Sequence, residues 1–163
     1  MPVVSNTSPI SNLALIARLD LLREQFGNIL IPEAVERELQ ALSNPQAKAA
    51  IAVALSQGWL EVRRAGEIPL IRLLEVSLHQ GESEAIALAV ETSAEWTLLD
   101  EREARAAAQR MNLPITGVLG VLLRAKRQGQ IPSLGPEMEQ LRREAHFFIA
   151  PELERYLLRL AGE

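Results

Sequence analysis

The stretch Gly81–Glu103, GESEAIALAVETSAEWTLLDERE, constrains the fold most, because it places a helix, a strand and the start of a second helix in direct succession. From Glu82 onward, small and apolar side chains recur at the spacing of one helical face. The apolar run Trp96–Leu99 is typical of a buried strand, and a second helix is predicted over Glu101–Met111. Asp100 therefore follows the carboxyl end of a strand, where ligands bind in open α/β sheets.

Four further short apolar runs predict strands, and helical segments separate them. The predicted strands are Pro2–Ser5, Ile29–Ile31, Trp59–Val62 (an edge strand), Trp96–Leu99 and Pro114–Ile115. Three of the predicted helices are defined by where they begin: at Pro9 with Ser8 as N-cap, at Pro32–Glu33, and after a break at Gly81. The other predicted helices span Leu19–Phe26, Pro45–Gln57, Ile68–Leu78, Glu101–Met111, Val118–Gln128, Ser133–Arg143 and Pro151–Leu160. This alternation predicts one domain over residues 1–163, a three-layer α/β/α sandwich with a mainly parallel sheet.

Composition narrows the chemistry that the chain can perform. With 163 residues and 48% hydrophobic residues, the chain can bury a core, and no apolar run approaches the ~18 residues of a membrane span. The N-terminus lacks a signal-peptide pattern, so we expect a cytoplasmic protein. There is no cysteine, and the only histidines are His79 and His146, which excludes thiol catalysis and makes a histidine metal site improbable. Any catalysis should therefore depend on carboxylates.

Right-handed crossovers place the carboxyl ends of parallel strands at one edge of the sheet. Asn6, Asp100 and Thr116 should be neighbours there, and the helices carrying Glu38 and Glu82 can lean over the same edge. Converging carboxylates repel one another unless a cation joins them, and Mg²⁺ or Mn²⁺ is the usual hard cation for oxygen ligands. Such a site suits cleavage of a nucleic-acid backbone.

Each of these residues also has a plainer interpretation. Asp100 could cap the helix that follows it, Glu82 could complement a helix dipole, Glu38 could be a surface residue and Asn6 a turn residue. Glu84 is best explained as solvated. Their shared position at the sheet edge favours the functional interpretation.

Basic residues follow this predicted site, although the net charge of the chain is -4. Between residues 101 and 131, six basic side chains face only two acidic ones; the basic ones are Arg102, Arg105, Arg110, Arg124, Lys126 and Arg127. They form either a solvated helix face or a patch that contacts phosphates.

The chain resembles the PIN-domain nuclease superfamily, and within it a prokaryotic branch of unknown function related to VapC-type toxins. The resemblance is carried by SNTSPISNLALIARLDLL, LIPEAVEREL, GESEAIALA, LLDEREAR and ITGVLGVLLRAKRQGQIPSL, and it extends nearly from end to end.

This resemblance implies roles for particular residues. The acidic positions of PIN nucleases fall on Asn6, Glu38, Glu82 and Asp100, with Thr116 near a fifth polar position. We expect Glu38, Glu82 and Asp100 to be catalytic, and Asn6, Glu82 and Asp100 to bind metal. Nucleic-acid contacts are expected at Arg102, Arg105 and Thr116. Asn6 departs from the family's aspartate, since an amide offers an oxygen but no charge.

The favoured function is therefore an Mg²⁺- or Mn²⁺-dependent endoribonuclease, the toxin of a toxin–antitoxin pair. The resemblance also implies a homodimer and a small antitoxin protein as partner. The main alternative is a PIN-like module with impaired catalysis that binds RNA or a partner protein. A third possibility is a purely structural dimerising domain.

Overall fold

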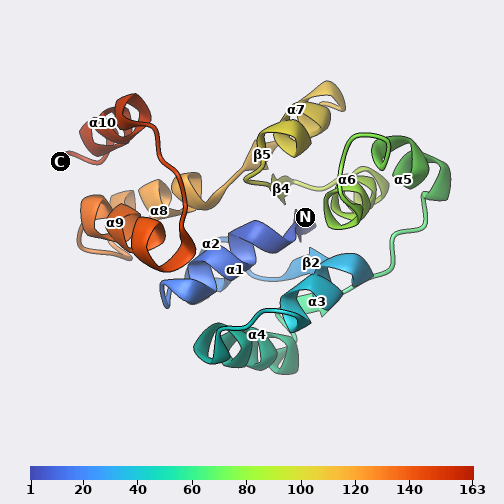
Figure 1. Cartoon of the computed structure of the whole chain (residues 1–163), viewed down its shortest axis with the longest axis horizontal. Coiled ribbons are helices and arrows are strands. Elements are labelled where there is room, and N and C mark those ends of the chain that lie inside the picture. Colours follow the sequence, from blue (N-terminus) through green and yellow to red (C-terminus); the bar gives the residue numbers. More distant parts are fainter.

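The protein is built on one five-stranded parallel sheet, which confirms the predicted α/β/α sandwich. The computed structural model describes residues 1–163 (Figure 1). The strands are β1 (Val3–Ser5), β2 (Ile29–Ile31), β3 (Leu60–Val62), β4 (Trp96–Leu98) and β5 (Ile115–Thr116). Their order across the sheet is β3-β2-β1-β4-β5, and every neighbouring pair is parallel.

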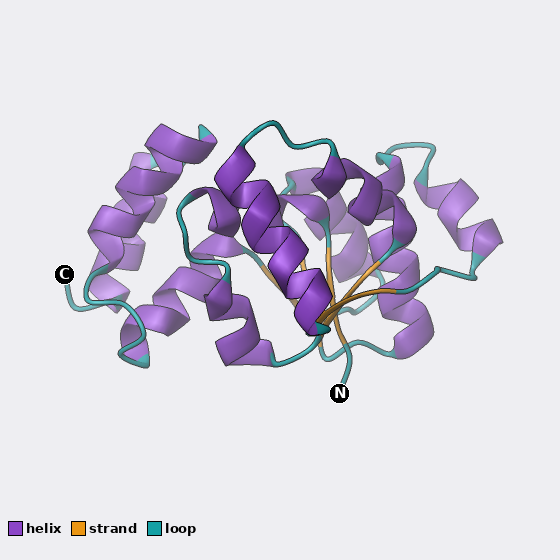
Figure 2. Ribbon diagram, turned by 90° about the horizontal axis from the view of Figure 1, so that it is seen from below, coloured by secondary structure: helices purple, strands orange, loops and turns teal.

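Ten helices surround this sheet and enclose the strands on both sides (Figure 2). They are α1 (Thr7–Leu15), α2 (Asp20–Phe26), α3 (Glu33–Gln40), α4 (Pro45–Gln57), α5 (Ile68–Leu74), α6 (Gln80–Thr92), α7 (Arg102–Arg110), α8 (Val118–Arg127), α9 (Leu134–Ala145) and α10 (Pro151–Leu160). None of them combines the length and the hydropathy that crossing a membrane requires.

The alternation of side chains along β1 explains how both faces of the sheet are covered. Val3 packs into the larger core cluster, which contains residues of α1, α2, α4, α8 and α9, whereas Val4 packs on the opposite face with residues of α6. Successive strand residues point to opposite faces, so a strand buried on both faces is apolar throughout. This is why three-residue strands could be recognised from short apolar runs.

The start of α1 differs from the prediction. The helix begins at Thr7, with Asn6 at the N-cap position, rather than at Pro9 with Ser8 as N-cap. Pro9 is still in the first turn, where its missing N–H leaves no hydrogen bond unmade. The Ser8 hydroxyl donates to the carboxylate of Glu101 instead of capping its own helix.

The predicted helix break at Gly81 is also wrong, because α6 begins at Gln80 and includes Gly81. The reason for a glycine here is a close approach and not a turn. A Cβ atom at this position would lie 2.7 Å from Oε1 of Glu38 on α3. Gly81 thus lets the Glu38 carboxylate lie against the first turn of α6.

Candidate active site

A small, wholly polar cavity lies at the carboxyl-terminal edge of the sheet. It has a volume of about 180 Å³, and we name it the acidic pocket. No hydrophobic side chain lines it; its lining residues are Asn6, Thr7, Ser8, Glu38, His79, Glu82 and Glu101. These residues come from the ends of β1 and β4 and from the first turns of α1 and α6, together with α3.

Glu38 reaches this pocket although its side chain is exposed. The Thr7 hydroxyl donates a hydrogen bond to Oε2 of Glu38, and Gly81 leaves room for the carboxylate. Two contacts from other elements therefore orient a side chain that would otherwise be free in solvent. An ordinary surface glutamate has no such partners.

Glu101 lines the acidic pocket, and the sequence analysis did not assign it a role. Its Oε2 accepts a hydrogen bond from Nδ2 of Asn6 at 3.3 Å, and its Oε1 accepts one from the Ser8 hydroxyl. The available signal was the pair of acids Asp100–Glu101 after β4. Successive side chains diverge at a strand end, so only one of the two could face this pocket.

Glu82 is the most buried of the pocket's carboxylates, with 7% of its surface exposed. Burial raises the pKa of its carboxyl group, and the negative charges of Glu101 and Glu38 raise that pKa further, while His79 opposes the shift. Glu82 lies in the first turn of α6, where the helix dipole also favours an acid. Removing its charge from water therefore has a cost that a bound cation would offset.

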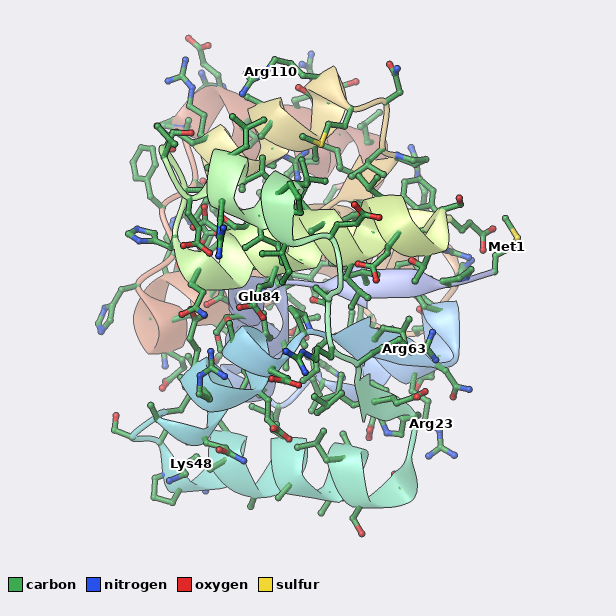
Figure 3. The ribbon with its side chains drawn as sticks, turned by 90° about the vertical axis from the view of Figure 1, so that its right-hand side faces the viewer. Met1, Arg23, Lys48, Arg63, Glu84 and Arg110 are labelled. Carbon is green, nitrogen blue, oxygen red and sulfur yellow. The ribbon has the colours of Figure 1, made fainter.

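Glu84 has a different position from Glu82 on the same helix. Figure 3 shows it between α6 and α3, where its Oε1 accepts a hydrogen bond from the backbone N–H of Ala34 at 3.2 Å. Its Oε2 accepts one from Nε2 of Gln80 at 2.9 Å. Glu84 is thus half-buried and joins two helices, rather than fully solvated as expected.

Asp100 does not line the acidic pocket; it lines a neighbouring cavity of about 400 Å³. Its Oδ1 accepts a hydrogen bond from the N–H of Val118 at 2.9 Å, so it caps α8 and not α7 as the plainer interpretation proposed. Burial raises the pKa of Asp100 to about 6; the Val118 N–H and Arg105 oppose this shift, and Glu101 adds to it. Its Oδ2 is buried and makes no hydrogen bond of normal geometry, although the nearby Asn12 side chain also lowers the pKa of Asp100.

The three residues predicted to contact nucleic acid lie around Asp100. Thr116 and Arg105 line the same cavity, and Nη1 of Arg105 donates to the backbone oxygen of Leu99 at 2.8 Å. Arg102 is exposed at the start of α7. Of the six basic residues between 101 and 131, only Lys126 has an acidic partner, Glu163 at 4.0 Å. Arg102 is therefore free to bind an anion, whereas Arg105 is partly engaged by the Leu99 oxygen and by the nearby charge of Asp100.

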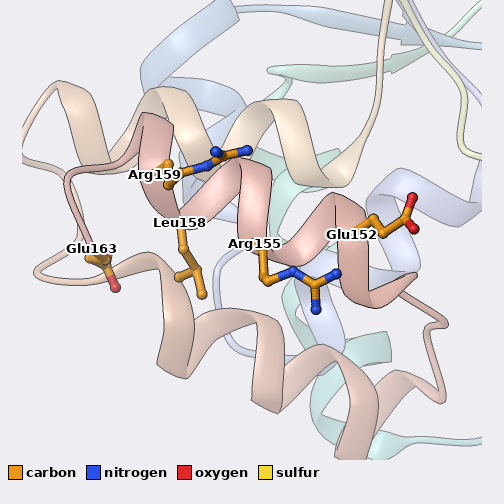
Figure 4. Close-up of a pocket in the computed structure, with 5 residues that line it drawn as sticks. All are labelled: Glu152, Arg155, Leu158, Arg159 and Glu163. Atoms are coloured by element: carbon orange, nitrogen blue, oxygen red, sulfur yellow. The ribbon is translucent and has the colours of Figure 1, made fainter.

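A larger cavity lies elsewhere in the molecule. It has a volume of about 590 Å³ and lies along α10, lined by Glu152, Arg155, Leu158, Arg159 and Glu163 (Figure 4). The Glu163 carboxylate is already engaged, since it accepts hydrogen bonds from the N–H groups of Leu134 and Gly135 at the start of α9. The clustered carboxylates favour the smaller acidic pocket as the functional site.

The donor atoms at the sheet edge suit a hard divalent cation. No group of three or more His, Cys, Asp or Glu side chains is arranged so that it could hold a metal ion as it stands. Two of the predicted ligands nevertheless carry a buried oxygen with no hydrogen-bond partner, Oδ1 of Asn6 and Oδ2 of Asp100. Such oxygens, together with the clustered carboxylates, are the donors that Mg²⁺ and Mn²⁺ prefer. The residues thus fit a divalent metal in their chemistry.

Comparison with known protein families identifies the family of this chain. A family model described as a PIN domain matches residues 2–163. The chain therefore belongs to the PIN-domain nuclease superfamily, whose members generally depend on divalent metals. A search of curated proteins found no match to the chain.

The raised pKa values of Glu82 and Asp100 predict how stability depends on pH. A carboxyl group whose pKa is raised in the folded state binds protons more tightly there, so the free energy of unfolding falls as pH rises through the unfolded and then the folded pKa. For Asp100 this loss between pH 3.8 and about 6 is at most about 3 kcal/mol. In a chelating buffer, Asp100→Asn and Glu82→Gln should each raise the melting temperature at pH 8, and the gain should shrink at pH 4.

Glu84→Gln is the matched control, because it removes one charge from α6 outside the pocket while keeping an acceptor for Ala34. Thermal melts at pH 4 and pH 8 give the melting temperatures of all three variants. Equal gains at both pH values for Asp100→Asn and Glu82→Gln would contradict the assigned pKa shifts.

A second prediction concerns the glycine in the first turn of α6. Gly81→Ala should keep or raise the melting temperature, since alanine is better than glycine in a helix by about 1 kcal/mol. Its Cβ would displace the Glu38 carboxylate, so Mn²⁺ affinity measured by titration calorimetry should fall.

A double-mutant cycle tests whether the effect acts through Glu38. Gly81→Ala should weaken Mn²⁺ binding in the wild-type background and have little further effect when combined with Glu38→Gln. Additive effects would show that the glycine acts through some other contact.

Proposed function

We propose that the protein is an Mg²⁺- or Mn²⁺-dependent endoribonuclease and the toxin component of a toxin–antitoxin pair. The observation that carries this proposal is the acidic pocket, in which three glutamates converge with one amide, two hydroxyls and the imidazole of His79, and with no arginine or lysine. The unpartnered oxygens of Asn6 and Asp100 support metal binding at the same edge. Membership of a nuclease superfamily supports the reaction class.

Asn6 and Glu82 in the acidic pocket would hold the metal, with Glu101 beside them, and Asp100 would have to reach it from the neighbouring cavity that it lines. When bound, a divalent cation makes hydroxide available near neutral pH and stabilises charge on a phosphoryl group. Glu38 and Glu82 are the carboxylates able to accept a proton from an attacking water, and Thr7 keeps Glu38 oriented for this role. Arg102, Arg105 and Thr116 would bind the phosphates of the RNA next to the pocket.

The alternative is a PIN-like module with impaired catalysis that binds RNA or a partner protein. One observation favours it: Asn6 is neutral, and its amide group donates to Glu101 rather than adding a negative charge. Metal affinity would then be lower than in a site with an aspartate at this position. The proposals of a homodimer, of a small antitoxin partner and of a cytoplasmic location rest on the sequence resemblance and composition.

Cleavage of RNA tests the main proposal directly. The purified protein should cut labelled structured RNAs with Mn²⁺ or Mg²⁺ and not in excess chelator. Asp100→Ala should lower the rate by at least about 100-fold, the scale expected when a group that stabilises the transition-state charge is removed. Binding of RNA without any metal-dependent cleavage would favour the alternative instead.

The variant Asn6→Asp separates the two interpretations of Asn6. It would place a carboxylate opposite Oε2 of Glu101, where an amide donor now lies at 3.3 Å. Without metal, we expect the added repulsion to lower the melting temperature, and we expect Mn²⁺ to restore it, because the extra charge then faces a cation. Nuclease activity should rise with the tighter metal binding.

Asn6→Ala is the control for this variant, because it removes the hydrogen bond without adding charge. If Mn²⁺ restores Asn6→Ala as fully as Asn6→Asp, the metal does not bind at this position. A melting temperature of Asn6→Asp that drops and does not recover with Mn²⁺ would refute a metal-ligating role for Asn6.

A further inference from the structure

One imidazole lies among the carboxylates of the acidic pocket, and the proposed mechanism leaves it without a role. His79 lines the pocket together with its three glutamates. Because no lysine or arginine lines the pocket, His79 supplies its only basic side chain. The sequence argues against a metal site built from several histidines, but a single imidazole among carboxylates is a different set of ligands.

His79 is held by its backbone and not by its side chain. It is the N-cap residue of α6, and its backbone oxygen accepts hydrogen bonds from the N–H of Ser83 at 3.0 Å and from the Ser83 hydroxyl at 2.9 Å. The residue is exposed, and its ring forms no ion pair with an acidic side chain. The start of α6 is thus fixed, while the imidazole remains able to turn.

The ring is close to the most buried carboxylate of the pocket. Burial raises the pKa of Glu82, and the charge of His79 is near enough to oppose that shift. His79 and Glu82 are three positions apart at the start of α6, a spacing that brings side chains to the same face of a helix. The side chains do not form a complete metal site as they stand. A cation held by Glu82 therefore requires the ring of His79 to turn inward.

A buried amide oxygen provides a second, independent indication of a cation. Asn6 lines the same pocket with 3% of its surface exposed, and its Oδ1 has no hydrogen-bond partner. An unpaired buried oxygen costs free energy that a bound cation would offset. The amide brings an oxygen without a charge. The donors of the pocket are thus not all of the anionic kind that Mg²⁺ favours.

An imidazole changes which cation a carboxylate site prefers. Mg²⁺ takes oxygen ligands and usually keeps several of its waters. First-row transition ions also bind nitrogen, and their affinity for a given site generally increases from Mn²⁺ through Co²⁺ to Ni²⁺. A nitrogen ligand in the acidic pocket would therefore favour these ions over Mg²⁺.

We propose that His79 is a nitrogen ligand of the cation in the acidic pocket and makes the pocket prefer Mn²⁺ and later transition ions to Mg²⁺. This inference rests on the metal-dependent function proposed above and specifies its metal. Glu82 and Oδ1 of Asn6 supply oxygen ligands, and His79 turns from solvent to add a ring nitrogen. Mg²⁺ gains little from that nitrogen and keeps a water in its place.

Pulsed electron paramagnetic resonance of bound Mn²⁺ tests the ligation directly, because a coordinated imidazole couples its nitrogen to the metal. The chain has only two histidines, and His146, exposed at the C-cap of α9 and outside the pocket, is the matched control. The coupling should appear in the wild type and in His146→Gln and be absent from His79→Gln. Histidine labelled with ¹⁵N should change the coupling in the wild type without any substitution.

Titration calorimetry with Mg²⁺, Mn²⁺ and Ni²⁺ tests the preference. His79→Gln should weaken Mn²⁺ binding by at least about 10-fold, the lower end of the loss seen when even an indirect partner of a metal is removed. The loss should be larger for Ni²⁺ and small for Mg²⁺, because the glutamine amide still offers an oxygen. His146→Gln should leave binding at the pocket unchanged. Both histidines are exposed, so both variants should fold, which thermal melts in excess chelator check.

A nitrogen coupling that persists in His79→Gln would overturn the proposal, as would equal losses of affinity for the three ions. Mn²⁺ bound without any nitrogen coupling in the wild type would also overturn it, and RNA cleavage by that protein would leave the nuclease function standing on oxygen ligands alone. Nitrogen-ligated Mn²⁺ without any RNA cleavage would instead refute the nuclease function and leave the role of His79 standing. A pocket that binds none of the three ions would refute both.

Discussion

The pairing of β1 with β4 in the centre of the sheet determines where every group of the site lies. Ser5 pairs with Leu98, and the N–H of Asn6 continues the ladder by donating to the Leu98 oxygen at 3.0 Å. The chain then leaves β1 and β4 toward different neighbours, β2 on one side and β5 on the other. At such a reversal of strand order the connections separate and leave room for a ligand. The acidic pocket occupies this position.

Around that position the negative charges of the carboxylates are not balanced by positively charged side chains. The hydroxyls of Thr7 and Ser8 and the amide of Asn6 donate to Glu38 and Glu101, but each is a neutral donor. Burial is the main reason why Glu82 and Asp100 have raised pKa values, and the uncancelled charge of Glu101 raises both further. The site is thus ordered by short-range hydrogen bonds while its charge remains available to a cation. This agrees with the metal dependence that is general among PIN domains.

Local pattern was sufficient for the architecture. Short apolar runs identified all five strands. The inner strands β1, β2 and β4 are largely buried and need no polar alternation, and the edge position of Trp59–Val62 follows from the break at Glu61. The helix starts were less predictable. Ser8 and Gly81 have ordinary local meanings, as an N-cap and a helix breaker, which their contacts with Glu101 and Glu38 override.

The sequence predicted the region in which the site lies, but not which side chains face each cavity. Strand order brings Asn6, Asp100 and Thr116 to one edge, and this followed from the crossover rule. Which of two consecutive acids faces which cavity depends on the twist at the end of β4, which no spacing in the sequence reveals. The hydrogen bond between Thr7 and Glu38, thirty-one residues apart, had no local signal either.

The division of Asp100 and Glu101 between two cavities has a consequence for how this protein can change over evolution. Which cavity each side chain faces depends on the number of residues between β4 and α7, because successive side chains point in opposite directions. Adding or deleting one residue there would exchange the two side chains and disrupt both cavities at once. The connection can therefore vary in residue type far more readily than in length. Elsewhere, as in the exposed turn between α3 and α4, a change of length alters neither cavity. Relatives of this chain should accordingly differ in length at such turns while keeping this one junction constant.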